Sequence, residues 1–197
     1  MLLHERLNNY HLLLASQSPR RRELLAGCGL SFTLAPKFEV EELFPKDMPA
    51  EEVAEYLSQL KSEGYPYELA EEDILLTADT VVIAQGEILG KPHSFDEAAR
   101  MLELLSGGAH KVVTGVTLRS NRKLKKFSVA TEVYFRELSH DEILYYIERY
   151  KPYDKAGSYG IQEWIGYIGI ERIEGSFYNV MGLPVQRLYR EIEQFIG

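Results

Sequence analysis

The chain has 197 residues, of which 45% are hydrophobic and 26% are charged, as is usual for a globular protein. Its formal net charge of −8 argues against non-specific binding to nucleic acid, and no run is long and apolar enough to cross a bilayer. The single cysteine, Cys28, excludes an internal disulfide, and the charged start lacks the apolar core of a signal peptide. We therefore expect one domain, residues 1–197, in a reduced cytoplasmic setting, binding neither nucleic acid nor membranes.

The first chemically informative stretch covers residues 12–25. The apolar residues 12–15 predict a buried strand. Ser18 and Pro19 then predict the start of a helix, because serine caps helix N-termini and proline fits the first helical position. Three arginines follow in the first turn: Arg20, Arg21 and Arg22. Since the helix dipole disfavours cations there, the strand–loop–helix context favours a bound phosphate or carboxylate over the alternative, a solvated basic turn.

An acidic segment and a second helix come next. Residues 31–36 resume an extended pattern, and three glutamates follow: Glu39, Glu41 and Glu42. These form either a solvated acidic loop or ligands for a hard cation, because Mg²⁺ sites use one or two carboxylates together with substrate phosphates. Pro49 opens the helix, and Lys61 lies in its last turn before Gly64. The helix dipole alone explains a lysine at that position.

Residues 74–84 predict a buried strand that is β-branched and apolar apart from Thr77, Asp79 and Thr80. An ionised carboxylate inside such a strand is unfavourable unless it is paired or bound to a metal. We therefore predict that Asp79 binds a metal or acts as a general base. The alternative is a structural role in which Asp79 caps a neighbouring loop.

A turn is predicted at Gln85-Gly86, and Gly90-Lys91 follows it. These two residues look like the end of a P-loop, but the glycine spacing is one short and Pro92 stands where Ser or Thr is required. We reject the P-loop interpretation, although Lys91 can still reach a phosphate.

The remaining elements alternate between helices and strands. Capping boxes are predicted at Ser94 with Glu97 and at Ser139 with Glu142. Four strands are predicted in this half of the chain: residues 110–119, 125–137, 165–173 and 177–181. A final helix begins near Pro184. This mixed order indicates one α/β unit.

Residues 151–162 form the second chemically informative stretch. It holds Asp154, Lys155, Tyr159 and Gln162, and its glycines at 157 and 160 allow a ligand to approach the backbone closely. Residues 156–160 match a serine nucleophile elbow only superficially, because no apolar strand precedes them and the first glycine of that pattern is missing. The five histidines show no zinc-binding spacing.

Five segments of the chain carry a family resemblance: ASQSPRR, TADTVV, LGKP, LSGGAHKVVTGV and DKAGSYGIQ. Their sequences and their order resemble those of the Maf family of nucleoside triphosphate pyrophosphatases, from about Leu13 to Pro184. The resemblance implies an α/β fold with an elongated mixed sheet flanked by helices, in two lobes around a central cleft, similar to inosine triphosphate pyrophosphatase. It also implies a cytoplasmic homodimer that hydrolyses a nucleoside triphosphate to the monophosphate and pyrophosphate, using Mg²⁺, Mn²⁺ or Co²⁺.

The resemblance also assigns roles to individual residues. Three of them would hold phosphate: Ser16, Arg20 and Arg21. Three lysines would neutralise the triphosphate: Lys61, Lys91 and Lys155. Asp79 matches the catalytic aspartate and a metal ligand, Thr80 lies near the substrate, and Glu41 matches an acidic position that helps to bind the metal. Gln162 falls in a YGIQ segment similar to the branch that acts on dTTP and UTP, and its amide offers both a donor and an acceptor to a pyrimidine.

Two departures and two alternatives accompany this interpretation. Ser158 stands where relatives often have alanine, and Glu163 and Trp164 depart from the family's glycine-rich continuation next to the expected base pocket.

The first alternative is a nucleotide-binding regulatory module without turnover, against which Asp79 argues because such a module needs no buried carboxylate facing an anion. The second is a purine-directed pyrophosphatase, against which Gln162 argues.

Overall fold

The structure is a computed structural model that describes all 197 residues. The chain divides into two compact units. Unit 1 comprises residues 1–79, 114–129 and 182–197, and unit 2 comprises residues 80–113 and 130–181. Three long strands contribute residues to both units: β3 (Asp73–Ala84), β5 (Ala109–Arg119) and β6 (Leu124–Phe135). None of the helices combines the length and the hydrophobicity that a bilayer crossing requires.

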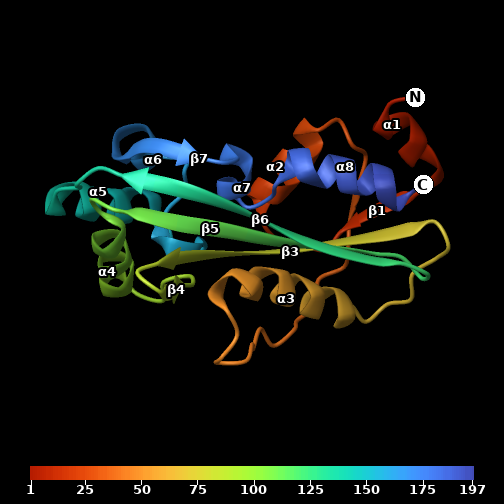
Figure 1. The fold of residues 1–197 in the computed structure, drawn as a ribbon, viewed down its shortest axis with the longest axis horizontal. Coiled ribbons are helices and arrows are strands. Elements are labelled where there is room, and N and C mark those ends of the chain that lie inside the picture. The colour runs from red at the N-terminus through yellow and green to blue at the C-terminus, as the bar shows by residue number, and fades with distance from the viewer. The chain divides into compact units, whose positions relative to one another are not determined.

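Unit 1 also contains two short strands and four α-helices: β1 (His11–Leu14), β2 (Thr33–Leu34), α1 (Leu3–Arg6), α2 (Pro19–Gly27), α3 (Ala50–Glu63) and α8 (Val185–Phe195), with a 3₁₀ turn at Leu7–Asn9. Strand β1 pairs in parallel with β2 and with β3, so that Leu13 lies opposite both Thr33 and Leu75. Helix α3 covers one side of these strands, and α2 and α8 lie on the other side (Figure 1). The predicted strand at 12–15 and the predicted helices starting at Pro19 and near Pro184 are confirmed.

Unit 2 contains the remaining elements: β4 (Glu87–Leu89), β7 (Ile170–Glu174), α4 (Phe95–Leu105), α5 (His140–Tyr150), α6 (Trp164–Gly169) and α7 (Phe177–Met181), with a 3₁₀ turn at Ala156–Ser158. Strand β4 runs antiparallel to β3 after the predicted turn, where Gln85 and Gly86 both have positive φ angles of 50° and 81°. Strand β7 runs antiparallel to β6. The seven strands form one mixed sheet in the order β2-β1-β3-β5-β6-β7, with β4 beside β3, which confirms the predicted mixed α/β class.

Two strand predictions near the C-terminus are wrong. Residues 177–181 form the helix α7, and of the predicted strand at 165–173 only the part that overlaps β7 is extended. Helix α7 is held by Asn179, a fully buried residue whose Nδ2 donates to Val112 O at 3.2 Å and to Thr131 Oγ1 at 3.0 Å. Gly166 in helix α6 packs against the segment before the helix so closely that a Cβ would overlap the carbonyl of Ile161. Both arrangements depend on contacts that local sequence patterns do not contain.

Only one of the two predicted capping boxes is complete. At α5, Ser139 Oγ accepts from Glu142 N at 3.3 Å, and Glu142 Oε2 accepts from Ser139 N at 2.8 Å. At α4, Ser94 Oγ accepts from Glu97 N at 3.1 Å, but the Glu97 carboxylate accepts the N–H of His93 instead of that of Ser94. The helix still begins where the prediction places it, because the serine cap alone binds a free N–H group of the first turn.

We expect His110, in the core of unit 2, to make the stability of the protein depend on pH. Its Nε2 lies 2.7 Å from the Tyr159 hydroxyl, and burial lowers the pKa of His110 from 6.5 to about 4. Between these values the unfolded chain binds a proton that the folded chain does not bind, so stability falls as the pH is lowered.

We expect the free energy of unfolding to drop by about 3 kcal/mol between pH 6.5 and pH 4 because of His110. Urea unfolding at several pH values measures the drop, and His110→Gln should remove that part of it. If the free energy of unfolding depended on pH in the same way in the parent and in His110→Gln, His110 would not be the group responsible.

Candidate functional site

The segment between β1 and α2 positions the first predicted site residues. Ser18 caps α2, since its Oγ accepts a hydrogen bond from Arg21 N at 3.4 Å, and Pro19 occupies the first helical position. Ser16 Oγ in turn accepts the N–H of Ser18 at 3.3 Å. These contacts place Ser16 and the first turn of α2 next to each other, as the sequence predicts.

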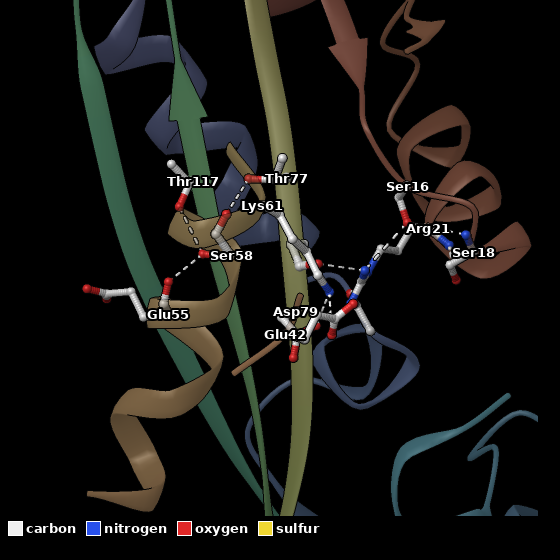
Figure 2. Close-up of polar contacts among 12 residues, drawn as sticks. Ser16, Ser18, Arg21, Glu42, Glu55, Ser58, Lys61, Thr77, Asp79 and Thr117 are labelled. Atoms are coloured by element: carbon white, nitrogen blue, oxygen red, sulfur yellow. Dashed lines mark hydrogen bonds and ion pairs between the residues drawn. The ribbon is translucent and has the colours of Figure 1, made fainter. Parts of the chain in front are cut away.

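The side chain of Arg21 is engaged with backbone carbonyl groups of unit 1. Its Nε donates to Gly182 O and its Nη1 donates to Ala78 O, both at 2.8 Å, and Nη1 lies 3.5 Å from Ser16 Oγ (Figure 2). Burial lowers the pKa of Arg21, and the negative charge of Asp79 opposes that shift. In this arrangement Arg21 supports the backbone immediately before Asp79, in addition to any contact that it makes with a ligand.

A charged cluster surrounds Asp79 on β3. Lys61 Nζ on α3 pairs with Asp79 Oδ1 and lies 3.1 Å from Glu42 Oε2, so two carboxylates share one ammonium group (Figure 2). The side chains of Lys61 and Asp79 are only 19% and 13% exposed. Because little water screens this pair, its electrostatic interaction is stronger than that of a surface ion pair.

Helix α3 holds Lys61 in place through buried polar contacts with the sheet. Ser58 lies one turn before Lys61 on the same helix face. Its Oγ lies 2.9 Å from Thr117 Oγ1, and its carbonyl accepts from Thr77 Oγ1 at 2.7 Å (Figure 2). At Gly115 on β5, the backbone of α3 approaches so closely that a Cβ would overlap it. The helix is therefore fixed on β3 and β5, and Lys61 is fixed with it.

Two of the glutamates that the sequence offers as metal ligands lie in different surroundings. Glu41 is exposed and joins no ion pair, whereas its neighbour Glu42 reaches the Asp79 cluster through Lys61. No group of three or more His, Cys, Asp or Glu side chains gathers closely enough to hold a metal ion by itself. Two carboxylates do suit Mg²⁺ when substrate phosphates complete its coordination, so Asp79 and Glu42 fit a divalent cation of that kind.

The second stretch forms a tightly bonded loop in unit 2. Lys155 is buried and pairs with Asp154 Oδ1 at 2.7 Å and with Glu163 Oε1 at 3.2 Å. Glu163 Oε2 accepts a hydrogen bond from the Tyr146 hydroxyl. In the same loop, Gln162 Oε1 is buried without a hydrogen-bond partner. A buried acceptor without a partner is unfavourable by about 1–3 kcal/mol, and a ligand donor would remove that penalty.

Lys91 and Thr80 complete the predicted set. Lys91 is exposed and follows Gly90, whose carbonyl accepts from Gly157 N at 3.0 Å, so the segments carrying Lys91 and Lys155 are neighbours in unit 2. Thr80 is half-buried and directly follows Asp79 on β3. Within unit 1 the structure thus gathers three predicted residues around Asp79: Ser16, Arg21 and Lys61. Within unit 2 it gathers Lys91, Lys155 and Gln162 around the Gly157 loop, whereas Glu41 stays exposed.

A sequence profile of the Maf family, described as Maf-like protein, matches residues 11–195. The chain belongs to the Maf family. It is 52% identical over 193 residues to a dTTP/UTP pyrophosphatase of Porphyromonas gingivalis, with 97% of each chain covered. It is 50% identical over 190 residues to the protein of the same name from Phocaeicola vulgatus, covering 96% of this chain and 98% of that one. The Ham1 protein of Staphylococcus aureus has a similar fold, with a TM-score of 0.52 at 15% identity, covering 94% of this chain and 99% of that chain.

Sequence analysis assigned no individual role to three residues of the candidate site: Glu42, Tyr146 and Glu163. Glu42 was visible only as a member of an acidic cluster, in which nothing distinguishes it from Glu41. Tyr146 lies on the apolar stripe of α5, where an aromatic residue is explained by the core alone. Glu163 did carry a signal, because it departs from the continuation that the family usually shows.

The contacts of Arg21 give a prediction for stability. We expect Arg21→Met to lower the free energy of unfolding by about 2 kcal/mol, because the carbonyls of Ala78 and Gly182 lose a charged donor. Arg22→Met is the matched control, since Arg22 donates at 3.1 Å to Gln17 O in an exposed pair. Urea unfolding of both variants compares them. If both variants lost the same free energy of unfolding, or if Arg21→Met changed only the KM for the substrate, Arg21 would not support the backbone.

Proposed function

We propose that this Maf-family chain is a nucleoside triphosphate pyrophosphatase that converts dTTP and UTP to the monophosphate and pyrophosphate. The observation that carries the proposal is the shielded pair of Asp79 and Lys61 in unit 1, which the half-exposed Glu42 joins through Lys61. A carboxylate held in one orientation by an ammonium group suits the activation of water. Relatives named dTTP/UTP pyrophosphatase, at 52% and 50% identity over nearly the whole chain, support both the reaction and the choice of base.

The charge of the cluster argues for a divalent cation as a cofactor. The carboxylates of Asp79 and Glu42 are balanced by Lys61 and Arg21, so the cluster has no excess positive charge with which to offset a triphosphate. Arg20 in the first turn of α2 supplies part of that charge. We assign the rest to Mg²⁺, Mn²⁺ or Co²⁺ held by Asp79 and Glu42. Such an ion, when bound, neutralises negative charge on the phosphate oxygens and orients them.

The chain's own residues then have separate tasks. Asp79 accepts a proton from, or positions, the water that attacks the α-phosphorus. Lys61 keeps the Asp79 carboxylate in one orientation, since α3 is fixed on the sheet by Ser58. Arg20 and the predicted lysines offset the charge that develops on the pyrophosphate leaving group. Gln162 contacts the base, which makes the Gly157 loop the source of nucleotide preference.

The test is the release of pyrophosphate by the full chain from canonical and modified nucleoside triphosphates. We expect dTTP and UTP to give pyrophosphate and the monophosphate in the presence of Mg²⁺, Mn²⁺ or Co²⁺, and we expect a chelator to abolish turnover. Activity confined to purine nucleotides would contradict the assigned base preference. Nucleotide binding that is equal with and without the metal, and without turnover, would contradict the enzymatic proposal and favour a regulatory module.

We also propose that the chain acts in the cytoplasm as a homodimer and binds neither nucleic acid nor membranes. The net charge of −8 supports the absence of nucleic-acid binding. The dimer and its location follow from the family resemblance. Sedimentation equilibrium should give about twice the chain mass of 22.6 kDa, and a mass equal to that of one chain would contradict the dimer.

A further inference from the structure

One buried tyrosine anchors the loop on both sides of Gln162. The Tyr146 side chain on α5 is fully buried, and its hydroxyl accepts a hydrogen bond from Gly160 N at 3.0 Å. The same hydroxyl donates to Glu163 Oε2. Burial and the Glu163 carboxylate raise the pKa of Tyr146 far above its ordinary value, so the hydroxyl remains a donor at any working pH. Gln162 thus lies between two residues that bind the same hydroxyl group.

The Glu163 carboxylate is fixed at both of its oxygens. Its Oε1 lies 3.2 Å from Lys155 Nζ, while Oε2 binds Tyr146. A Cβ on Gly160 would lie 3.1 Å from Glu163 Oε2 and 3.1 Å from Gln162 Nε2. The carboxylate oxygen and the amide nitrogen therefore approach the same point beside Gly160.

This arrangement gives the Gln162 amide a preferred orientation. The negative carboxylate of Glu163 favours the positive NH₂ end on its side and leaves the amide oxygen on the other. That oxygen is buried without a partner, so it is available to a ligand donor. An amide that rotated freely could present either a donor or an acceptor. Uracil and thymine carry an N3–H donor, whereas the N3 atom of cytosine is an acceptor, so only a fixed amide can distinguish them.

We propose that Tyr146 and Glu163 are positioning residues that hold Gln162 as a hydrogen-bond acceptor and thereby select bases with an imide N–H over cytosine. The choice of substrate in this proposal rests on the proposed function, but the orientation of Gln162 does not. Both positioning residues act through Gln162 and contact no reacting atom.

The first test measures the ratio of kcat/KM for dTTP to that for dCTP. Tyr146→Phe keeps the ring and removes the hydroxyl, and Glu163→Gln keeps an oxygen for Tyr146 but removes the charge. We expect each substitution to lower the ratio by about ten-fold or more, since loss of one base-specific hydrogen bond has an effect of this size. Tyr159→Phe is the matched control, because it removes another buried hydroxyl of the same loop, the one bound to His110. It should lower the melting temperature and leave the ratio unchanged. An unchanged ratio in both Tyr146→Phe and Glu163→Gln would overturn the proposal.

A second measurement separates this proposal from the proposed function. NMR of the uniformly ¹⁵N-labelled, nucleotide-free chain reports the Gln162 side-chain amide and the Gly160 backbone amide. In Tyr146→Phe we expect the Gln162 resonances to shift and the Gly160 amide to exchange faster with solvent. If the unsubstituted protein hydrolysed neither dTTP nor dCTP, the proposed function would be wrong. The NMR resonances would still decide whether Tyr146 positions Gln162. Unchanged Gln162 and Gly160 signals would overturn that positioning role.

Discussion

Replacement of Asp79 by asparagine is expected to lower pyrophosphate release from dTTP by about 10³-fold, within the range for loss of a general base. Asparagine has nearly the same size as aspartate, and its amide oxygen can still accept a hydrogen bond from Lys61, so the fold should persist. The neutral amide can neither accept a proton from water nor bind a divalent cation as a carboxylate does. Initial rates with saturating dTTP and Mg²⁺ measure the effect, and thermal unfolding checks that the variant is folded.

Asp73 provides the matched control for this substitution. It lies at the start of the same strand, β3, and its carboxylate accepts the N–H of Ala70 at 2.8 Å, outside the Asp79 cluster. Asp73→Asn should change the rate by no more than about two-fold. If Asp79→Asn retained turnover similar to that of Asp73→Asn, the assignment of Asp79 to the attacking water would be wrong.

Gly115→Ala is expected to lower the free energy of unfolding by about 4 kcal/mol, more than the usual effect of overpacking. The added methyl group would overlap the backbone of Ala54 and Glu55, and backbone atoms cannot rotate away as a side chain can. Helix α3 must therefore move away from β5. Lys61 moves with the helix, so turnover should fall even in the folded fraction. Urea unfolding and initial rates measure the two effects.

Gly27→Ala is the control for the added methyl group itself. Gly27 ends α2, and a Cβ there would meet no atom within 4 Å. Its replacement should leave the free energy of unfolding within about 1 kcal/mol of the parent, with a gain expected if the conformation suits alanine. Equal stabilities of the Gly115→Ala and Gly27→Ala variants would contradict the close contact between α3 and the sheet.

Sequence predicted those parts of the fold whose determinants are local. The start of α2 follows from Ser18 and Pro19, and the strand β3 follows from its β-branched run. The prediction failed at residues 177–181, because the helix there depends on Asn179 and its distant partners Val112 and Thr131. A mostly apolar segment of five residues suits a strand or a helix equally well, and only tertiary contacts decide between them.

The residues of the candidate site likewise divide into those that the local sequence predicts and those that depend on tertiary contacts. Asp79 was identified from sequence because a carboxylate in an apolar strand is unfavourable without a partner, and the structure provides Lys61 as that partner. The choice between Glu41 and Glu42 depends on which side chain of an irregular loop faces Lys61, and residue type does not encode that. The direction of Arg21 likewise depends on carbonyl groups from Ala78 and Gly182, which lie far from it in sequence.

The most direct test of the proposed reaction is hydrolysis of dTTP in H₂¹⁸O, after which the products are separated and their masses are measured by mass spectrometry. Attack of water on the α-phosphorus predicts dTMP carrying one ¹⁸O atom and pyrophosphate carrying none. Label in pyrophosphate would place the attack on the β-phosphorus and contradict the role of Asp79 at the α-phosphorus. Formation of dTDP with labelled phosphate would contradict the pyrophosphatase assignment itself.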